Sequence, residues 1–150
     1  VRIVTQNVDG YHQQAGSRDV LEFHGNIWQV RCQPCGRQHD DRRVPIPIPP
    51  ACDACGGLLR PAVVWFGESI DTQVMHASAA AVTQCDLFLV IGTAGAVHPA
   101  AGLVDMAGGS GATVVEFNVE RSAVSALADL FVPGSAADTV AGIVPDAGAG

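Results

Sequence analysis

The sequence predicts an α/β fold, built on a parallel sheet, with a small inserted module that binds a metal. Apolar runs typical of buried strands occupy residues 2–5, 86–91, 113–117 and 129–132. Helical patterns occupy residues 72–83, 98–107 and 122–128. Strands that alternate with helices form βαβ units and a parallel sheet. Residues 31–60 interrupt this alternation with four cysteines, five prolines and many charges, which indicates a separate module.

Composition restricts the classes of protein that are possible. With 48% hydrophobic and 15% charged residues, the 150-residue chain has the composition of a folded domain. The longest apolar run, residues 87–91, is too short to span a membrane. The given residues do not open with a basic and then apolar pattern, so we expect no secretory leader. We therefore expect a cytoplasmic protein without a membrane partner. The chain begins at a strand-like Val1, so we expect that its natural start has been cut off.

The charge of the chain argues against nucleic acid as a partner. The net charge is −7, from 15 acidic and 8 basic residues. Such a surface repels phosphate backbones and favours basic partners, although solubility alone also accounts for it.

The remaining elements are shorter. Residues 20–23 and 27–30 are predicted as strands or turns, residues 63–66 as an extended segment, and residues 138–144 as a closing helix. Within the module, Pro45, Pro47, Pro49 and Pro50 exclude helix, and we expect little regular structure there. Residues 145–150 are rich in glycine and alanine and are predicted to be a flexible tail.

Four cysteines in two pairs predict a zinc site. Cys32 and Cys35 form one Cys-x2-Cys knuckle, and Cys52 and Cys55 form the second. Four thiolates complete a tetrahedral shell and leave no position for water, so the site is predicted to be structural. The alternative is four unliganded or redox-active thiols. The fifth cysteine, Cys85, is interpreted as a small buried hydrophobe, and His12, His39 and His76 as surface histidines.

Polar and glycine residues follow the predicted strands, at residues 6–10, 92–95 and 118–120. In open α/β sheets, ligands bind at the carboxyl ends of the strands, so these loops indicate a nucleotide-type site. His24 lies between Phe23 and Gly25, close to the cysteine module and after the first of these loops. Histidine can act as a general base at neutral pH, although a packed or surface histidine would have the same sequence.

Six segments together resemble the sirtuins, the NAD-dependent protein-lysine deacylases. They occur in the family's order from residue 1 to about residue 144, and they are residues 5–10, Glu22-Phe23-His24-Gly25, the two cysteine knuckles, residues 61–68, Gly92-Thr93-Ala94 and Asn118-Val119-Glu120. The short distance between the knuckles and the Trp65-Phe66-Gly67-Glu68 segment are most similar to the bacterial-type branch, which includes desuccinylases. The resemblance implies a Rossmann-like NAD-binding domain, formed by residues 1–30 and 61–144, around a zinc module at residues 31–60.

The resemblance also implies a reaction. An enzyme of this family cleaves the bond between nicotinamide and ribose in NAD after the acyl oxygen of an acyl-lysine attacks the ribose. The base deprotonates a ribose hydroxyl, which then attacks the acyl carbon. The products are free lysine, nicotinamide and O-acyl-ADP-ribose, and the partners are acyl-lysine proteins or peptides carrying acetyl or succinyl groups.

The resemblance assigns roles to residues of this chain. His24 matches the base, and Gln6 and Asn7 match residues that hold the nicotinamide ribose. Val8 and Asp9 match those that hold the carboxamide. The other matched sets are Val64, Trp65 and Phe66 for the acyl-lysine peptide; Gly92, Thr93 and Ala94 for the ribose and phosphates; and Asn118, Val119, Glu120 and Ala136 for adenosine.

Two departures separate the chain from the family pattern. The family's first strand and glycine-rich phosphate loop are absent, so we expect an incomplete sheet and a weakened pyrophosphate site. Ala94 stands where the family usually has serine, which removes a hydroxyl contact worth about 1 kcal/mol. These departures leave open a zinc-bearing pseudoenzyme that only binds partners. A third alternative transfers ADP-ribose to protein with the same residues.

Overall fold

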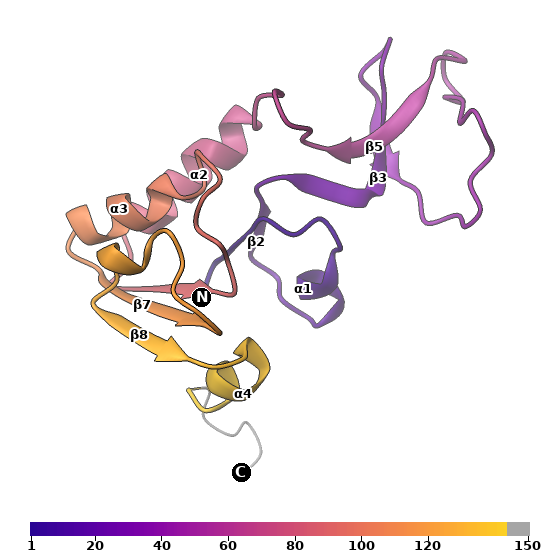
Figure 1. The fold of residues 1–150 in the computed structure, drawn as a ribbon. Coiled ribbons are helices and arrows are strands. Elements are labelled where there is room, and N and C mark those ends of the chain that lie inside the picture. Colours follow the sequence, from indigo (N-terminus) through magenta and orange to yellow (C-terminus); the bar gives the residue numbers. More distant parts are fainter. Residues whose placement is uncertain (144–150) are drawn as a thin grey trace. The chain divides into compact units, whose positions relative to one another are not determined.

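The computed structural model describes residues 1–143, and the contacts within it divide the chain into two compact units. The first unit is Val1–Met75 and the second is His76–Gly150. Figure 1 shows the strands and helices of each unit along the chain. The predicted tail, residues 145–150, and the last residue of the predicted closing helix lie outside the described residues.

A two-stranded parallel sheet opens the first unit. The strand β1 (Ile3–Thr5) pairs with β2 (Val20–Glu22), in the register Ile3 to Val20. Between them lies one helical turn, α1 (Tyr11–Gln14), which the sequence did not indicate. It begins after Gly10, whose φ of 72° requires the left-handed region that glycine tolerates best. The strand predicted at residues 2–5 is confirmed by β1, although Thr5 is its only buried residue.

A three-stranded antiparallel sheet follows, in the order β4-β3-β5. The strand β3 (Gly25–Cys32) pairs with both β4 (Gln38–Asp40) and β5 (Leu59–Val63). The expectation of little regular structure in residues 31–60 is therefore wrong in part. This range contains all of β4, the last two residues of β3 and the first two of β5. The strands alternate so that Val30, Cys32 and Leu59 face inward and form a small core with Cys52. Residues 41–58, which contain the four prolines, have no helix and only an isolated bridge between Ala51 and Leu58.

The predicted extended segment at residues 63–66 is wrong at Phe66, which lies in a turn after β5 ends at Val63. A tight turn replaces it, because the Glu68 amide donates to the Trp65 carbonyl at 2.9 Å. The Glu68 carboxylate also accepts the Trp65 amide at 3.1 Å, and Gly67 has a φ of 89°. Side-chain capping and a glycine with positive φ thus close the chain into a turn.

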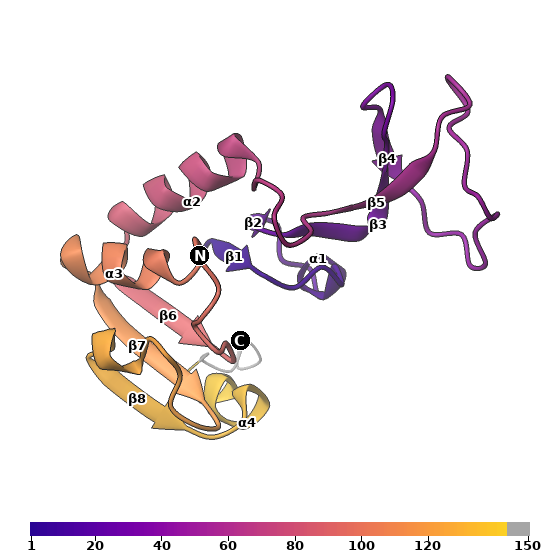
Figure 2. The ribbon, with the colours of Figure 1, turned by 45° about the horizontal axis from the view of Figure 1, so that its top comes forward.

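A second parallel sheet forms in the other unit, in the order β6-β7-β8. Its strands are β6 (Leu87–Ile91), β7 (Thr113–Asn118) and β8 (Leu130–Pro133), and all three agree with the predicted strands to within one residue. The helix α3 (Gly102–Gly109) connects β6 to β7 and packs against them (Figure 2). Its buried residues are Leu103, Val104 and Ala107. The helix α2 (Thr72–Thr83) has the predicted bounds and includes the boundary between the units.

Three helix predictions need correction. The helix predicted at residues 98–107 begins only at Gly102, because residues 98–101 form turns. The helix predicted at 122–128 is only the short 3-10 turn η1 (Ser125–Leu127). The turn ends there because Ala128 is extended, with φ of −85° and ψ of 136°, and the Asp129 amide donates to the Val114 carbonyl of β7 at 2.9 Å. The helix α4 (Ala136–Ala141) begins two residues early, because Ser135 caps it by accepting the Asp138 amide.

Two further expectations concern burial. Cys85 is only half-buried, and its thiol donates to the Val82 carbonyl at 3.1 Å. His76 is exposed as expected, but His12 and His39 are half-buried. Within the described residues, no helix is long and apolar enough to cross a membrane. The division into an NAD-binding domain at 1–30 and 61–144 and a module at 31–60 stays a prediction.

Candidate functional site

The two cysteine knuckles come together at one end of the β4-β3-β5 sheet. The Sγ atoms of Cys32, Cys35, Cys52 and Cys55 all lie within 4.8 Å of one another. The Cys32 and Cys55 sulfurs are 3.4 Å apart, and those of Cys35 and Cys52 are 3.9 Å apart. Four thiolates around a tetrahedral zinc at about 2.3 Å would be about 3.8 Å apart. The cluster therefore has the dimensions of a zinc site.

The two knuckles have the same backbone geometry. In the first, the Cys32 amide donates to Arg37 and its carbonyl accepts from Gly36; in the second, the Cys52 amide donates to Gly57 and its carbonyl accepts from Gly56. Gly36 and Gly56 have φ of 73° and 71°, so glycine is favoured at both turns. A Cβ atom at Gly57 would lie 2.5 Å from Pro34 and 3.2 Å from the Cys32 sulfur. These constraints hold the four thiols around one point.

The thiols in this cluster differ in acidity. The backbone N–H of Arg37 is the main cause that lowers the pKa of Cys35 to about 7. The Cys35 backbone N–H lowers the pKa of Cys32, but burial and the neighbouring thiols outweigh it and raise that pKa to about 12. Because the four sulfurs lie so close together, four thiolates would repel one another without a cation. A divalent cation removes this cost. The residues fit a structural zinc ion, with two ligands buried and two exposed.

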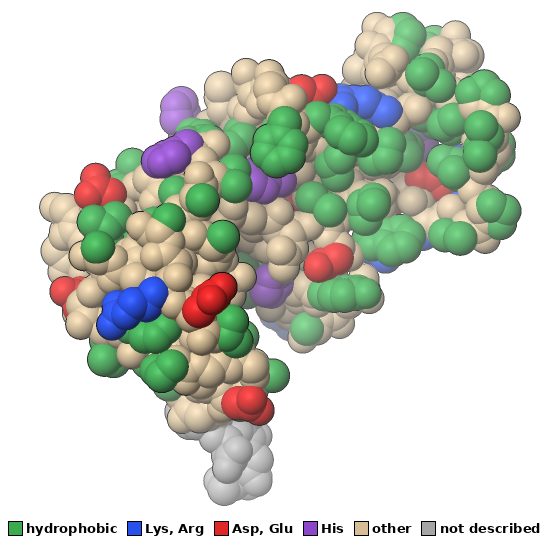
Figure 3. All heavy atoms as spheres, viewed as in Figure 1, with side chains coloured by type: hydrophobic (Ala, Val, Ile, Leu, Met, Phe, Trp, Pro, Cys, Tyr) green, Lys and Arg blue, Asp and Glu red, His purple; other side chains and the backbone are tan. Residues whose placement is uncertain are grey.

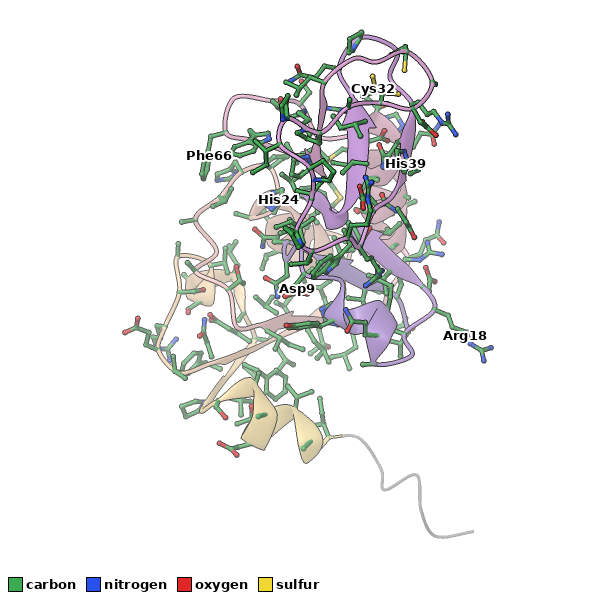
Figure 4. All side chains as sticks on the ribbon, turned by 90° about the vertical axis from the view of Figure 1, so that its right-hand side faces the viewer. Asp9, Arg18, His24, Cys32, His39 and Phe66 are labelled. Carbon is green, nitrogen blue, oxygen red and sulfur yellow. The ribbon has the colours of Figure 1, made fainter. Side chains whose placement is uncertain are left out.

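The polar loop at residues 6–10 is held beside His24. The His24 Nδ1 atom lies 3.2 Å from the Gln6 carbonyl oxygen, so we assign the proton to Nδ1 and leave Nε2 as an acceptor. The Phe23 ring, which is 1% exposed, meets the His24 ring edge to face at 5.7 Å. These contacts orient an imidazole whose free nitrogen can accept a proton. Figure 4 shows His24 and Asp9, with Cys32 further along β3.

Gly25 fixes the backbone directly after the histidine. Its φ is 80°, and a Cβ atom there would lie 2.1 Å from the Ala62 carbonyl oxygen. Only glycine therefore allows β3 to approach β5 at this point. The Val64 amide donates to the His24 carbonyl at 2.9 Å, which ties the start of the predicted peptide-binding segment to the candidate base.

The remaining residues of that segment are exposed. Trp65 and Phe66 are 56% and 99% exposed, and Figure 3 shows hydrophobic side chains on this part of the surface. Arg60 donates to Glu68 at 2.8 Å and is the first cause that lowers the pKa of Glu68. The Arg60–Glu68 ion pair and the turn at residues 65–68 thus hold both aromatic side chains in solvent. Neither side chain is part of a core.

In the second unit, the loop after β6 is tied to the end of β7. The Asn118 side chain donates to the Thr93 carbonyl at 2.8 Å, and the Ala123 amide donates to the Ala94 carbonyl at 3.0 Å. Gly92 has a φ of 58°, and no atom lies within 4 Å of the position its Cβ would take. Hydrogen bonds to Asn118 and Ala123 therefore hold the loop, while the space next to Gly92 is open. A surface that accepts a ligand has both properties.

A buried carboxylate organises this arrangement. Glu116, which is 0% exposed, accepts from the Ser125 hydroxyl and from Asn118 at 3.4 Å. Burial raises the pKa of its carboxyl, but hydrogen bonds outweigh this effect and hold the pKa below the ordinary value of 4.5. The donors are Ser122, Ser125 and Asn118. The ionised carboxylate therefore binds the two loops to each other.

Replacing Glu116 with glutamine is expected to destabilise the protein by about 1–3 kcal/mol, because an amide faces donors that need an acceptor. The folded-state pKa is lowered, so the stabilisation from ionised Glu116 is fully present above pH 4.5 and is lost as pH falls through the lower folded value. Thermal melts of the variant and the natural protein should therefore differ at pH 7 and converge at acid pH. Equal melting temperatures at pH 7 would contradict this role.

The structure brings some predicted site residues together and leaves others apart. The four cysteines form one cluster, and Gln6 contacts His24. In the second unit, Thr93 contacts Asn118. The predicted adenosine contacts Val119, Glu120 and Ala136 are exposed at the end of β7 and at the start of α4. The roles assigned to these residues toward a ligand stay predictions.

The structure also shows two residues that sequence reasoning missed. Glu116 is a charged residue inside an apolar strand, and this interruption is a signal that could have revealed a buried carboxylate. Trp28 lies in a strand close to His24, and its indole donates to the Asp9 carbonyl at 2.8 Å. Nothing in its sequence position distinguishes this contact from ordinary packing.

Comparisons with known proteins agree with these observations. The model of the Sir2 family matches residues 1–99. An NAD-dependent protein deacylase of Aquifex aeolicus is 48% identical over 129 residues, which are 85% of this chain and 54% of that protein. NAD-dependent protein deacylase 2 of Pyrobaculum aerophilum is 46% identical over 144 residues, or 96% of this chain and 58% of that protein. The chain thus spans about half the length of the curated relatives it matches.

Solved structures give the same result. A Sir2 homologue in complex with NAD superposes with a TM-score of 0.87 at 39% identity, covering 91% of this chain and 54% of that one. A Sir2 complex with a p53 peptide and NAD+ has a TM-score of 0.82 at 29% identity, covering 90% of this chain and 58% of that one. The expected α/β fold class is confirmed by these likenesses.

Proposed function

Because the chain belongs to the Sir2 family, we propose that the protein it represents removes acyl groups from protein lysines, with NAD as co-substrate. The observation that supports this best is the constellation around His24. Its Nδ1 is directed to the Gln6 carbonyl and its Nε2 is left as an acceptor, beside the loop whose counterpart in the family holds nicotinamide ribose. The relatives named as NAD-dependent protein deacylases support the same proposal.

In this proposal, each part of the chain has one task. Asn7 and Gln6 orient the ribose, Val8 and Asp9 hold the carboxamide, and His24 takes the proton from the ribose hydroxyl that attacks the acyl carbon. Val64, Trp65 and Phe66 contact the acyl-lysine peptide. Residues at strand ends in the second unit contact the rest of NAD: Gly92, Thr93, Ala94, Asn118, Val119, Glu120 and Ala136.

The partner is proposed to be an acyl-lysine protein or peptide that carries an acetyl or a succinyl group. A net charge of −7 suits lysine-rich substrates and disfavours nucleic acid. Zinc in the four-cysteine cluster would supply structure only, because thiolates occupy all four positions. We propose the cytoplasm as the compartment, since a reducing environment keeps the thiols available for zinc.

Two other functions use the same residues. A pseudoenzyme that only binds partners is favoured by Ala94, which has no hydroxyl to offer NAD. Transfer of ADP-ribose to protein would use the same NAD loops and the same histidine.

Product analysis separates these functions. We expect the intact protein, incubated with NAD and an acetyl- or succinyl-lysine peptide, to give the deacylated peptide and O-acyl-ADP-ribose by mass spectrometry. ADP-ribosylated protein as the main product would favour transfer instead. Absence of any NAD cleavage, in a protein that carries zinc and melts cooperatively, would favour the pseudoenzyme.

A further inference from the structure

We propose that Trp28 is a positioning residue that fixes the backbone of Val8 and Asp9 against the β3–β4 hairpin. The hairpin, formed by Gly25–Cys32 and Gln38–Asp40, carries the first cysteine knuckle in its turn. The meaning of this contact for NAD chemistry rests on the proposed function. The contact itself lies within the first unit and is independent of that function.

On one side, Trp28 and its neighbour hold the polar loop by two hydrogen bonds. The indole Nε1 of Trp28 donates to the Asp9 carbonyl at 2.8 Å, and the Ile27 amide donates to the Val8 carbonyl at 2.9 Å. A Cβ atom added at Gly10 would lie 3.5 Å from the Trp28 ring, so the loop passes directly over the indole. Two successive carbonyls of the loop are thus satisfied from β3.

On the other side, the hairpin holds Trp28. The Asp41 amide donates to the Trp28 carbonyl at 2.8 Å, and the Arg42 guanidinium lies 5.6 Å from the centre of the indole ring. This distance is within the range of a cation–π contact. Both residues directly follow β4, and the first cysteine knuckle connects β4 to β3. The contacts therefore come from the end of the same hairpin. The hairpin therefore holds the Trp28 backbone through Asp41 and contacts the indole through Arg42.

Asn26 fixes the start of the same strand. Its side-chain oxygen accepts the Trp28 amide at 2.8 Å, and its Nδ2 donates to Glu22 at 2.5 Å. Because Asn26 is 8% exposed, this pair sets the direction in which β3 leaves the turn at Gly25. The position of the Trp28 indole is thus determined by fixed neighbours on three sides, which is what a positioning residue requires.

Phenylalanine at position 28 separates the hydrogen bond from the packing. Trp28→Phe keeps an aromatic ring for Arg42 but removes the N–H that donates to Asp9. Gln29→Ala is the matched control, because it removes two side-chain hydrogen bonds of the next residue of β3 without touching the loop. Those bonds join Gln29 to Asp40 at 3.0 Å and to Gln38 at 2.8 Å.

Amide hydrogen exchange of the zinc-loaded protein tests the contact without any need for activity. We expect the Ile27 amide, which donates to Val8, to exchange about two- to tenfold faster in Trp28→Phe, as loss of one hydrogen bond implies. Gln29→Ala should leave its exchange unchanged. Equal exchange in Trp28→Phe and the natural protein, or an equal increase in both variants, would overturn the proposal.

Kinetics of the intact protein test the consequence. Trp28→Phe should raise the KM for NAD about three- to tenfold and leave the KM for the acyl peptide unchanged, whereas Gln29→Ala should change neither. Equal effects on both KM values would indicate general destabilisation and overturn the positioning role. If the natural protein has no activity, the proposed function fails, and the exchange result alone decides the role of Trp28.

Discussion

Replacing His24 with alanine is expected to lower the rate of lysine deacylation by about 10²- to 10⁴-fold, the usual contribution of a general base. The proposed base acts after nicotinamide has left, on the ribose hydroxyl that attacks the acyl carbon. The variant should therefore still exchange labelled nicotinamide into NAD in the presence of acyl peptide. Loss of deacylation with retained exchange places His24 at the second step.

The control for this prediction is His76→Ala, because His76 is an exposed histidine of α2 with no predicted role. It should retain the natural rate. Deacylation by His24→Ala at the rate of the natural protein would contradict the assignment of His24 as the base. Equal loss of exchange and deacylation would move its role to the first step or to NAD binding.

Removal of zinc is expected to unfold the cysteine-bearing part of the first unit. The core there consists of Val30, Cys32, Cys52 and Leu59, so two of its four buried residues are themselves predicted ligands. Such a core is too small to be stable alone, and the binding energy of a structural zinc, about 10–16 kcal/mol in small zinc domains, contributes directly to folding. Cys52→Ala should therefore lose zinc and lower the melting temperature sharply.

The measurements are zinc content by elemental analysis and thermal melting followed by circular dichroism. The natural protein should hold one zinc per chain, and a strong chelator should reproduce the effect of Cys52→Ala. Cys85→Ala is the matched control, because Cys85 lies outside the cluster and its thiol donates only to Val82 in the described residues. A Cys52→Ala protein with unchanged zinc content and melting temperature would contradict the predicted site.

Patterns that depend on local spacing were readable from the sequence. The strands Leu87–Ile91 and Thr113–Asn118 are mostly apolar, and Thr72–Thr83 is rich in alanine, which favours helix. The cysteine spacing predicted a cluster whose four sulfurs do lie together. Within each strand, helix or knuckle, the residues that define the feature are close in the chain, so tertiary contacts change it little.

Features that depend on side chains reaching the backbone were not readable. The pairing of Asp129 with Val114 of β7 ends a helix that composition favours, and Glu68 closes a turn where apolar residues suggest a strand. Likewise, the pairing that makes β4 depends on a partner strand brought close by the knuckles. Propensity does not contain these specific contacts, and they decide the local structure.

The same reasoning applies to the candidate site. His24, Asn118 and the cysteines stand in motifs that indicate chemistry, but the tautomer of His24 depends on the Gln6 carbonyl. Trp28 has a residue type that fits an ordinary core, whereas Glu116 signals a buried carboxylate but not the partners that it binds. Their roles become visible only through the hydrogen bonds that they make across the fold.

The most direct test of the proposed function is the ratio of nicotinamide released to lysine freed by the intact protein, measured with and without an acyl-lysine peptide. NAD-dependent deacylation predicts one nicotinamide for each lysine freed, with little release when the peptide is omitted. Nicotinamide release that is independent of the peptide, or lysine freed without NAD, would contradict it.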